Sequence, residues 1–237
     1  NILSSPYTRT FTVGGDIDDE ITEAEVLNKK LYISSKKQIT RVSPVGGNPD
    51  FSVQPVKSGW GFVSRTVERV TLPQIGEVLM GFCFDRRVRI FDGSEGVVIS
   101  DPIEQDNKMF PYPIRQANTI FFNKCFASLD TEEQVYKLWV VMSPSSETTH
   151  AFCYNLRTGA WYPYQYTDPG FNTAVMANSA DNTNALMAVG RDGYVYRLDT
   201  GNTDNGVPID EYYDLPFLYV KTPKAATKNS EIDLYFT

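Results

Sequence analysis

A short strand-and-turn unit that recurs along the chain restricts the possible folds more than any other feature. In each copy, aromatic or branched residues alternate with polar residues, and a turn that contains glycine ends the stretch. The copies occupy residues 87–93, 151–159 and 194–201, and residues 38–47 form a weaker fourth copy. Alternation with a period of two is typical of strands. The pattern therefore predicts an all-β protein built from repeated units.

The spacing of the copies indicates which all-β architecture is formed. The closing glycines at positions 47, 93, 159 and 201 are separated by 46, 66 and 42 residues. Two of these spacings match the roughly 40–50-residue period of β-propeller blades. The third spacing implies an insertion, which the proline-rich residues 101–116 would supply. We expect four to five propeller-like blades, in a ring that this chain need not complete alone. An antiparallel sandwich or barrel is the alternative.

The alternating pattern also predicts strands outside the recurring unit. These are residues 30–33, 61–64, 77–84, 119–122, 124–127, 135–142, 160–164 and 185–190. Only residues 18–28 fit a helical turn or two, and their carboxylates fit a solvated loop equally well. The character of the chain changes at residues 203–206. We therefore divide it into a propeller-like domain (residues 1–206) and a C-terminal strand-rich arm or start of a further β-domain (residues 207–237).

Charge and composition exclude several classes of protein. The chain has 22 Lys plus Arg against 29 Asp plus Glu, a net charge of −7. A tight general binder of nucleic acid needs a surplus of cations, and so does a protein attached to anionic membranes. The longest apolar run, residues 138–142, is far shorter than the roughly 20 residues that span a bilayer. The first residue, Asn1, is not followed by a leader, so we expect a processed, trimmed or partial chain.

The residues best suited to chemistry do not form a recognisable catalytic motif. Cys83, Cys125 and Cys153 are widely spaced in apolar surroundings, which predicts small core residues in a reducing compartment. His150 is the single histidine, and no G-x-S-x-G motif accompanies it. Phosphate-binding glycine motifs are likewise missing. The sequence therefore predicts a protein that is not an enzyme and has no cofactor or metal.

Some acidic and aromatic residues leave alternatives open. Residues 16–20 and 199–206 are rich in oxygen ligands for calcium, although solvated loops explain them better. Asp85 and Asp192 could form a glycosidase pair, although such residues are also common in turns. The aromatic residues 161–166 and Trp60 could stack on sugar, although packing between blades is more usual for such a run.

Two sets of residues are predicted to have structural roles. We expect the turn glycines to adopt a positive φ, because there a Cβ would cost about 1 kcal/mol or more. These glycines are Gly93, Gly159, Gly193 and Gly201. We also expect Trp139 and Trp161 to be buried between blades.

Two segments resemble structural propellers of tailed bacteriophages. Residues 153–161 (CYNLRTGAW) look like one blade of these proteins. Residues 189–199 (VGRDGYVYRLD) and 203–213 (TDNGVPIDEYY) are similar to the passage in which the last blade leads into an extended strand and a further β-domain. The group includes neck, stabilisation and tail-nozzle proteins of short-tailed phages. The resemblance covers residues 135–237 and implies no catalytic residues.

The leading hypothesis is therefore a non-enzymatic virion protein of a phage tail nozzle or neck, made in the host cytoplasm. Its partners would be other virion proteins, in a homo-oligomeric ring, with DNA passing by without tight binding and no membrane contact. The acidic residues Asp16, Asp18, Asp19 and Glu20 would form a solvated or lumen-facing segment. The alternative is a carbohydrate-binding or carbohydrate-cleaving propeller, either a lectin or a glycosidase. A WD40 or kelch scaffold lacks its signatures here.

Overall fold

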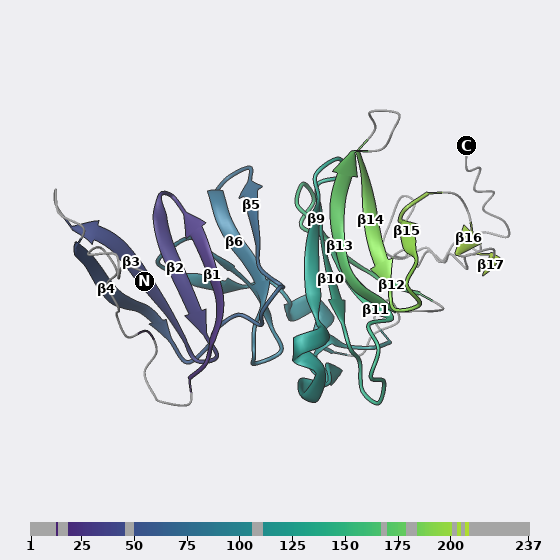
Figure 1. The fold of residues 1–237 in the computed structure, drawn as a ribbon, viewed down its shortest axis with the longest axis horizontal. Coiled ribbons are helices and arrows are strands. Elements are labelled where there is room, and N and C mark those ends of the chain that lie inside the picture. The colour runs from purple at the N-terminus through teal and green to yellow at the C-terminus, as the bar shows by residue number, and fades with distance from the viewer. Residues whose placement is uncertain are drawn as a thin grey trace, which may run out of the picture.

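Strands dominate the computed structural model of the protein and form four antiparallel sheets (Figure 1). The structure describes residues 13, 19–45, 50–105, 111–166, 170–178, 184–200, 203–204 and 207–208. Each sheet is a meander, in which strands that are consecutive in the chain are hydrogen-bonded neighbours. The prediction of an all-β protein with blade-like sheets is confirmed.

The four sheets follow one another in chain order. The first contains β1 (Ile21–Leu27), β2 (Lys30–Ser35), β3 (Gln38–Val45) and β4 (Asp50–Ser58). The second contains β5 (Glu68–Leu72), β6 (Gly76–Phe82), β7 (Val88–Phe91) and β8 (Gly96–Val98). The third contains β9 (Phe126–Asp130), β10 (Val135–Val140), β11 (His150–Asn155) and β12 (Trp161–Gln165). The fourth contains β13 (Phe171–Asn178), β14 (Asn184–Gly190) and β15 (Val195–Arg197).

The recurring sequence unit corresponds to the third strand of every sheet, which is β3, β7, β11 or β15. Each copy of the sequence unit therefore marks one of the four sheets. A further pair of short strands, β16 (Thr203–Asp204) and β17 (Val207–Pro208), follows the fourth sheet. The proposed boundary between residues 206 and 207 falls between these two strands. Residues 209–237 lie outside the described residues.

The long spacing between the second and third copies results from an insertion between the second and third sheets. Its described residues form three 3₁₀ helices: η1 (Asp101–Ile103), η2 (Ile114–Gln116) and η3 (Thr119–Lys124). The predicted strand at residues 119–122 is therefore wrong. The Asn118 side chain accepts a hydrogen bond from the Ile120 amide, which favours the start of a helical turn. Phe122 anchors this helix by packing against Phe82, with ring centroids 5.3 Å apart.

Two other local predictions are also wrong. Residues 18–28 contain β1 and not a helix or a solvated loop, because β1 pairs with β2 through a tight turn at Asn28 and Lys29. Both turn residues have positive φ, 49° and 62°, as the common two-residue hairpin requires. Residues 61–64 contribute only an isolated bridge between Phe62 and Cys83.

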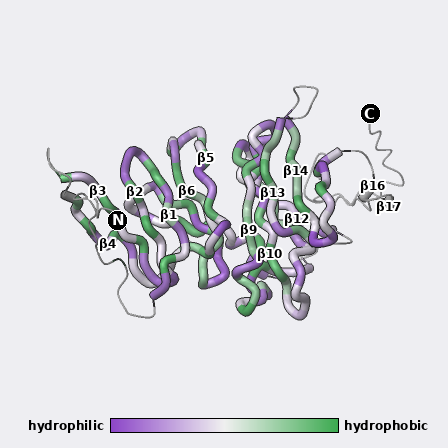
Figure 2. The backbone as a smooth tube through the Cα atoms, viewed as in Figure 1, coloured by the Kyte–Doolittle hydropathy of each residue, from purple (hydrophilic) through white to green (hydrophobic). Residues whose placement is uncertain are grey.

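Three hydrophobic cores hold the sheets together, one between each pair of neighbours. Hydrophobic segments run along the strands, and many of the turns at their ends are hydrophilic (Figure 2). The first core joins the first and second sheets through Leu27, Tyr32, Ile39, Leu79 and Phe91. The second joins the second and third sheets through Val78, Met80, Tyr136, Leu138 and Phe152. The third joins the third and fourth sheets through Phe126, Trp139, Phe171, Leu186 and Ala188.

The two middle sheets are therefore apolar on both faces. On β10, for example, Leu138 faces the second sheet and Trp139 faces the fourth. Trp139 is fully buried and stacks on Phe126, with ring centroids 4.9 Å apart. Trp161 is buried against the second sheet, where its Nε1 donates a hydrogen bond to the Ile99 carbonyl. The predicted burial of both tryptophans between blades is confirmed.

Three of the four predicted turn glycines have the expected backbone. Gly93, Gly159 and Gly193 have φ values of 99°, 71° and 88°, whereas Gly201 lies outside the described residues. Gly93 is also close to the first sheet, because a Cβ there would lie 2.6 Å from the Tyr32 hydroxyl. That hydroxyl donates a hydrogen bond to the Gly93 carbonyl and joins the two sheets.

Replacing Gly159 with valine is expected to lower the melting temperature. The positive φ at this turn is strained for a residue with a branched Cβ, at a cost of about 1–2 kcal/mol. Thermal unfolding followed by circular dichroism measures the change. Ala160→Val is the matched control, because Ala160 is exposed in the same turn and is not among the positive-φ residues. Equal melting temperatures for the two variants would contradict the turn geometry.

Candidate functional site

Three glutamates on the first strands of the first and second sheets form an acidic group. Glu23 and Glu25 lie on β1, and Glu68 begins β5. We call these three residues the glutamate group. Among the first strands, β5 contacts β9 and β9 contacts β13, whereas β1 contacts β6 of the second sheet. The glutamate group therefore lies at the junction of the first and second sheets.

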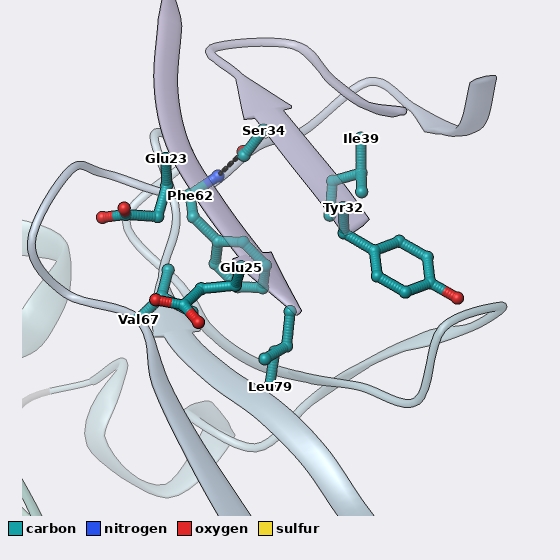
Figure 3. Close-up of a pocket in the computed structure, with 8 residues that line it drawn as sticks. All are labelled: Glu23, Glu25, Tyr32, Ser34, Ile39, Phe62, Val67 and Leu79. Atoms are coloured by element: carbon teal, nitrogen blue, oxygen red, sulfur yellow. Dashed lines mark hydrogen bonds between the residues drawn. The ribbon is translucent and has the colours of Figure 1, made fainter. Parts of the chain in front are cut away.

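A small cavity between the first and second sheets adjoins the glutamate group (Figure 3). Glu23 and Glu25 line it, and the Phe62 amide donates a hydrogen bond to the Ser34 hydroxyl at 2.8 Å in its wall. The cavity has a volume of about 10 Å³, which is room for about one water molecule. The cavity is too small to hold a sugar ring.

Burial and repulsion by neighbouring carboxylates raise the pKa values of Glu68 and Glu25. The pKa of Glu68 rises to about 7, first because the carboxylate is desolvated and then because Glu25 and Glu23 repel it. The pKa of Glu25 is also raised, by burial and by the charge of Glu23. Glu23 itself accepts a hydrogen bond from the Arg65 amide at 2.8 Å. Above neutral pH the ionised Glu68 carboxylate is therefore repelled by Glu25 and Glu23.

Stability is expected to fall as the pH rises from about 4.5 to about 7 and then to level off. The unfolded Glu68 carboxyl releases its proton near its ordinary pKa of 4.5, whereas the folded one holds its proton until about 7. The folded state is thus favoured at low pH by this residue. Glu68→Gln should raise the free energy of unfolding at pH 8 by about 1–3 kcal/mol and reduce its pH dependence.

Urea denaturation at pH 5 and pH 8 checks this expectation. Glu133→Gln is the control, because Glu133 is exposed at the turn after β9. If the free energy of unfolding depends on pH in the same way for Glu68→Gln, Glu133→Gln and the unchanged protein, the ionised Glu68 carboxylate does not destabilise the folded state.

A second cluster of charges connects the third and fourth sheets. Lys137, on β10, is buried and forms ion pairs with Asp130 and Asp199, the former at 3.7 Å. Its Nζ also lies 5.7 Å from the centre of the Tyr164 ring. Asp130 and Asp199 border a cleft of about 150 Å³ between the two sheets. The cation thus neutralises two acidic residues that approach from different sheets.

A second buried cation, Arg89, lies in the second sheet. The Arg89 guanidinium donates two hydrogen bonds, each of 2.7 Å, to the Asp85 carboxylate. The same guanidinium lies over the Trp60 ring, 4.8 Å from its centre. Trp60 packs in turn against Phe62 and Phe91. Asp85 and Trp60 therefore both take part in structural packing.

These contacts give structural roles to residues named in the sugar-binding alternatives. Asp85 lies in the second sheet and Asp192 in the fourth, with the third sheet between them. Sheets pack about 10 Å apart, so the two carboxylates are separated by roughly 20 Å, well beyond the ~5–9.5 Å of a glycosidase pair. Asp192 instead accepts a hydrogen bond from the Tyr194 amide in a turn. The buried Trp161 offers no stacking platform.

The predicted acidic segment is only partly described. Asp16 and Asp18 lie outside the described residues. Asp19 is buried, and its carboxylate accepts hydrogen bonds from the Ser35 hydroxyl at 2.6 Å and the Lys37 amide at 3.1 Å. The prediction of a solvated residue is therefore wrong for Asp19. Glu20 is exposed and pairs with Lys36 at 3.0 Å.

The single histidine is half-buried beside aromatic and polar neighbours. Its Nδ1 lies 3.1 Å from the Thr149 hydroxyl, and its ring meets the Tyr112 ring edge-on, with centroids 4.8 Å apart. Burial lowers the pKa of His150, which favours the neutral imidazole.

The three cysteines have the environment predicted for them. Cys83, Cys125 and Cys153 are buried free thiols. Burial raises the pKa of Cys83 to about 12 and that of Cys125 to about 11. Their prediction as small core residues is confirmed.

The described part of the chain lacks two further features. It contains no group of three or more His, Cys, Asp or Glu side chains arranged to hold a metal ion. None of its helices is long and apolar enough to cross a membrane.

Sequence reasoning missed the residues that dominate the electrostatics. Lys137 had a usable signal, because it is the lone charge in an apolar strand, residues 135–142. Glu68 and Arg89 had none, since alternating charged residues are common on exposed strand faces. Their burial depends on neighbouring sheets that are remote in sequence.

Comparison with known proteins does not assign the chain to a family. No protein-family model matches it, and no curated protein sequence shows significant similarity to it.

Proposed function

We propose that the protein is a non-enzymatic structural component of a bacteriophage virion, located in the tail nozzle or at the neck between head and tail. It acts through protein–protein interfaces, in a homo-oligomeric ring with other virion proteins as partners, after synthesis in the host cytoplasm. One observation carries the proposal. Four stacked sheets bury their faces against one another, and the apolar packing surfaces continue onto the outermost sheet, where Val175 and Val195 are exposed. Such an arrangement suits a subunit that associates with other proteins through its exposed sheet face.

The segments that resemble phage propellers support the same proposal. Residues 153–161 comprise the end of β11, its turn and the start of β12, and residues 189–199 comprise the corresponding turn and third strand of the fourth sheet. Both are blade hairpins, as the resemblance implies. The contacts of Asp85, Asp192 and Trp161 favour this role over the carbohydrate-active alternative.

The distribution of charge supports a role beside DNA without tight binding to it. The chain has a net charge of −7, and the glutamate group adds acidic side chains at the junction of the first and second sheets. Like charges repel, so phosphates would gain no counterion-release affinity from this side. We expect no shift of duplex DNA in a gel at micromolar protein and about 0.15 M salt. A distinct shifted band would contradict the proposed passage of DNA.

The proposal as a whole is tested on purified particles of the phage that encodes the chain. Particles are separated from free protein on a density gradient and analysed by quantitative mass spectrometry. We expect the chain to sediment with the particles in a fixed number of copies. If it stays at the top of the gradient while known capsid proteins sediment, the proposed function is wrong.

A further inference from the structure

A buried lysine lies against two carboxylates between the third and fourth sheets, which are neighbours in Figure 1. Lys137 alternates along β10 with Val135 and Trp139, and both of these pack in the core that joins the two sheets. The lysine side chain therefore points into an apolar region. Lysine is almost never buried without a paired charge, so the two carboxylates are needed to hold its ammonium group there.

The two carboxylates come from different sheets and are held in different ways. Asp199 follows β15, and its Oδ2 accepts a hydrogen bond from Nζ of Lys137. Asp130 ends β9, and its Oδ2 lies 3.7 Å from the same nitrogen. The Oδ1 atom of Asp130 accepts hydrogen bonds from the Glu132 and Glu133 amides, at 3.1 and 3.0 Å. Asp130 is therefore fixed with its second oxygen towards the lysine.

The lysine and Asp130 are shielded from water, whereas Asp199 is partly open to it. The Lys137 and Asp130 side chains are 3% and 6% exposed, and that of Asp199 is 28% exposed. Cys153 and Ser128, which pair with Lys137 on the neighbouring strands, are also buried. Both aspartates border the cleft of about 150 Å³ between the two sheets. The cleft therefore gives a molecule as small as water a route from Asp199 to solvent.

We propose that Lys137 and Asp199 condense into an isopeptide bond, an amide that joins their side chains and thereby links the third and fourth sheets covalently. Nζ of the lysine forms a bond with Cγ of Asp199, and the bond from Cγ to one carboxylate oxygen breaks. That oxygen leaves as water with two of the three ammonium protons, and the third proton stays on the amide nitrogen. The ion pair is the reactant of this step, which needs no oxidant, reductant or further reagent.

Asp130 is placed to move the protons, because an ammonium group has no lone pair with which to attack. Its Oδ2 takes one proton from Nζ and passes it to the Asp199 carboxylate, which makes Cγ a better electrophile. After Nζ has attacked, Asp130 carries the second proton from the nitrogen to the leaving oxygen and is ionised again at the end. Donor–acceptor distances are often longer before such a reaction than during it, so 3.7 Å suits this role.

Two physical effects favour the bond at this position. The fold holds the amine and the carboxyl in contact, which gives them a very high effective concentration. Condensation also replaces two charges by one neutral amide, and charges are costly to keep away from water. Lys57 and Glu95 are in contact too, at 2.7 Å, but Glu95 is 70% exposed. Water solvates that pair, so we expect no bond between its members.

The bond would connect residues that are 62 positions apart in the chain. A covalent link that closes a loop of this length restricts the unfolded chain, as a disulfide does. It would therefore keep the fourth sheet attached to the third when the packing between them loosens. The proposal concerns a single copy of the chain and does not depend on the proposed virion role.

Mass spectrometry of the purified full chain tests the proposal. We expect the intact mass to be lower than the mass calculated from the sequence by the mass of one water molecule. In a tryptic digest, the peptide that contains Lys137 should remain joined to the peptide that contains Asp199, and fragmentation should locate the bond. The full calculated mass would overturn the proposal, and so would a loss of water located at other residues.

Three substitutions separate the chemistry from the fold. Lys137→Arg and Asp199→Ala each remove one reactant, whereas Asp130→Asn keeps both reactants and removes the proton carrier. Each variant should have its full calculated mass. Lys36→Arg is the matched control, because Lys36 pairs with the exposed Glu20 and its replacement should leave the loss of water unchanged.

Circular dichroism shows which of these variants are folded. A folded Lys137→Arg or Asp199→Ala protein that still lacks one water would contradict the bond. A folded Asp130→Asn protein that forms the bond as completely as the unchanged chain would contradict the role of Asp130. Where a variant does not fold, the digest of the unchanged protein decides, because it shows directly whether residues 137 and 199 are joined.

Discussion

Replacing Trp139 with alanine is expected to lower the free energy of unfolding by about 3–5 kcal/mol, the usual cost of truncating a large buried aromatic side chain. Trp139 is fully buried and stacks on Phe126, with the planes of the two rings 13° apart. It fills the core between the third and fourth sheets, where Phe171 and Leu186 face it. Truncation would leave a cavity between the two sheets, and the cost of such a cavity increases with its volume.

Urea denaturation of the variant measures this cost. Tyr194→Ala is the control, because Tyr194 is an aromatic residue that is 69% exposed at the edge of the fourth sheet. The control should change stability by less than about 0.5 kcal/mol. If the two substitutions destabilise the protein equally, the third core does not hold the fourth sheet in place.

Replacing Lys137 with methionine should have a similarly large effect, about 3–5 kcal/mol. The ammonium group is buried and forms ion pairs with Asp130 and Asp199. Methionine keeps most of the volume but removes the positive charge, which leaves two acidic side chains without their counter-charge. Such a change costs far more than the loss of an exposed pair.

The matched control for this prediction is Lys36→Met. Lys36 pairs with Glu20 at 3.0 Å, but both side chains are exposed, so the loss should be below about 1 kcal/mol. Chemical denaturation at neutral pH compares the two variants. Equal stability of the two would show that Lys137 is not essential to the junction between the third and fourth sheets.

Much of the architecture could be predicted from local sequence patterns. The third strand of each sheet has alternating residues and an adjacent glycine turn, and these features depend only on neighbouring residues. The positive φ of Gly159 and the burial of Trp139 were predicted in the same way. Strong periodicity and turn chemistry were sufficient for these elements.

The first strands of the sheets were harder to predict, because partners distant in sequence stabilise them. β1 contains glutamates that are compatible with a loop, and only its pairing with β2 makes it a strand. β13 contains small and polar residues, and its pairing with β14 determines its structure. The chain gives no local signal for such pairing.

The electrostatic groups could not be predicted for the same reason. Glu68 approaches Glu23 and Glu25 only because the first two sheets pack together. Lys137 and Asp199 are 62 residues apart and come from different sheets. Charges that are separated in sequence meet only after the sheets have stacked.

Electron cryo-microscopy of purified particles tests the central claim most directly. The account predicts density in the tail nozzle or neck that fits the four stacked sheets, repeated around the tail axis, with the first strands and their glutamate group facing the channel. A complete map of the tail and neck in which no density fits this fold would contradict the account.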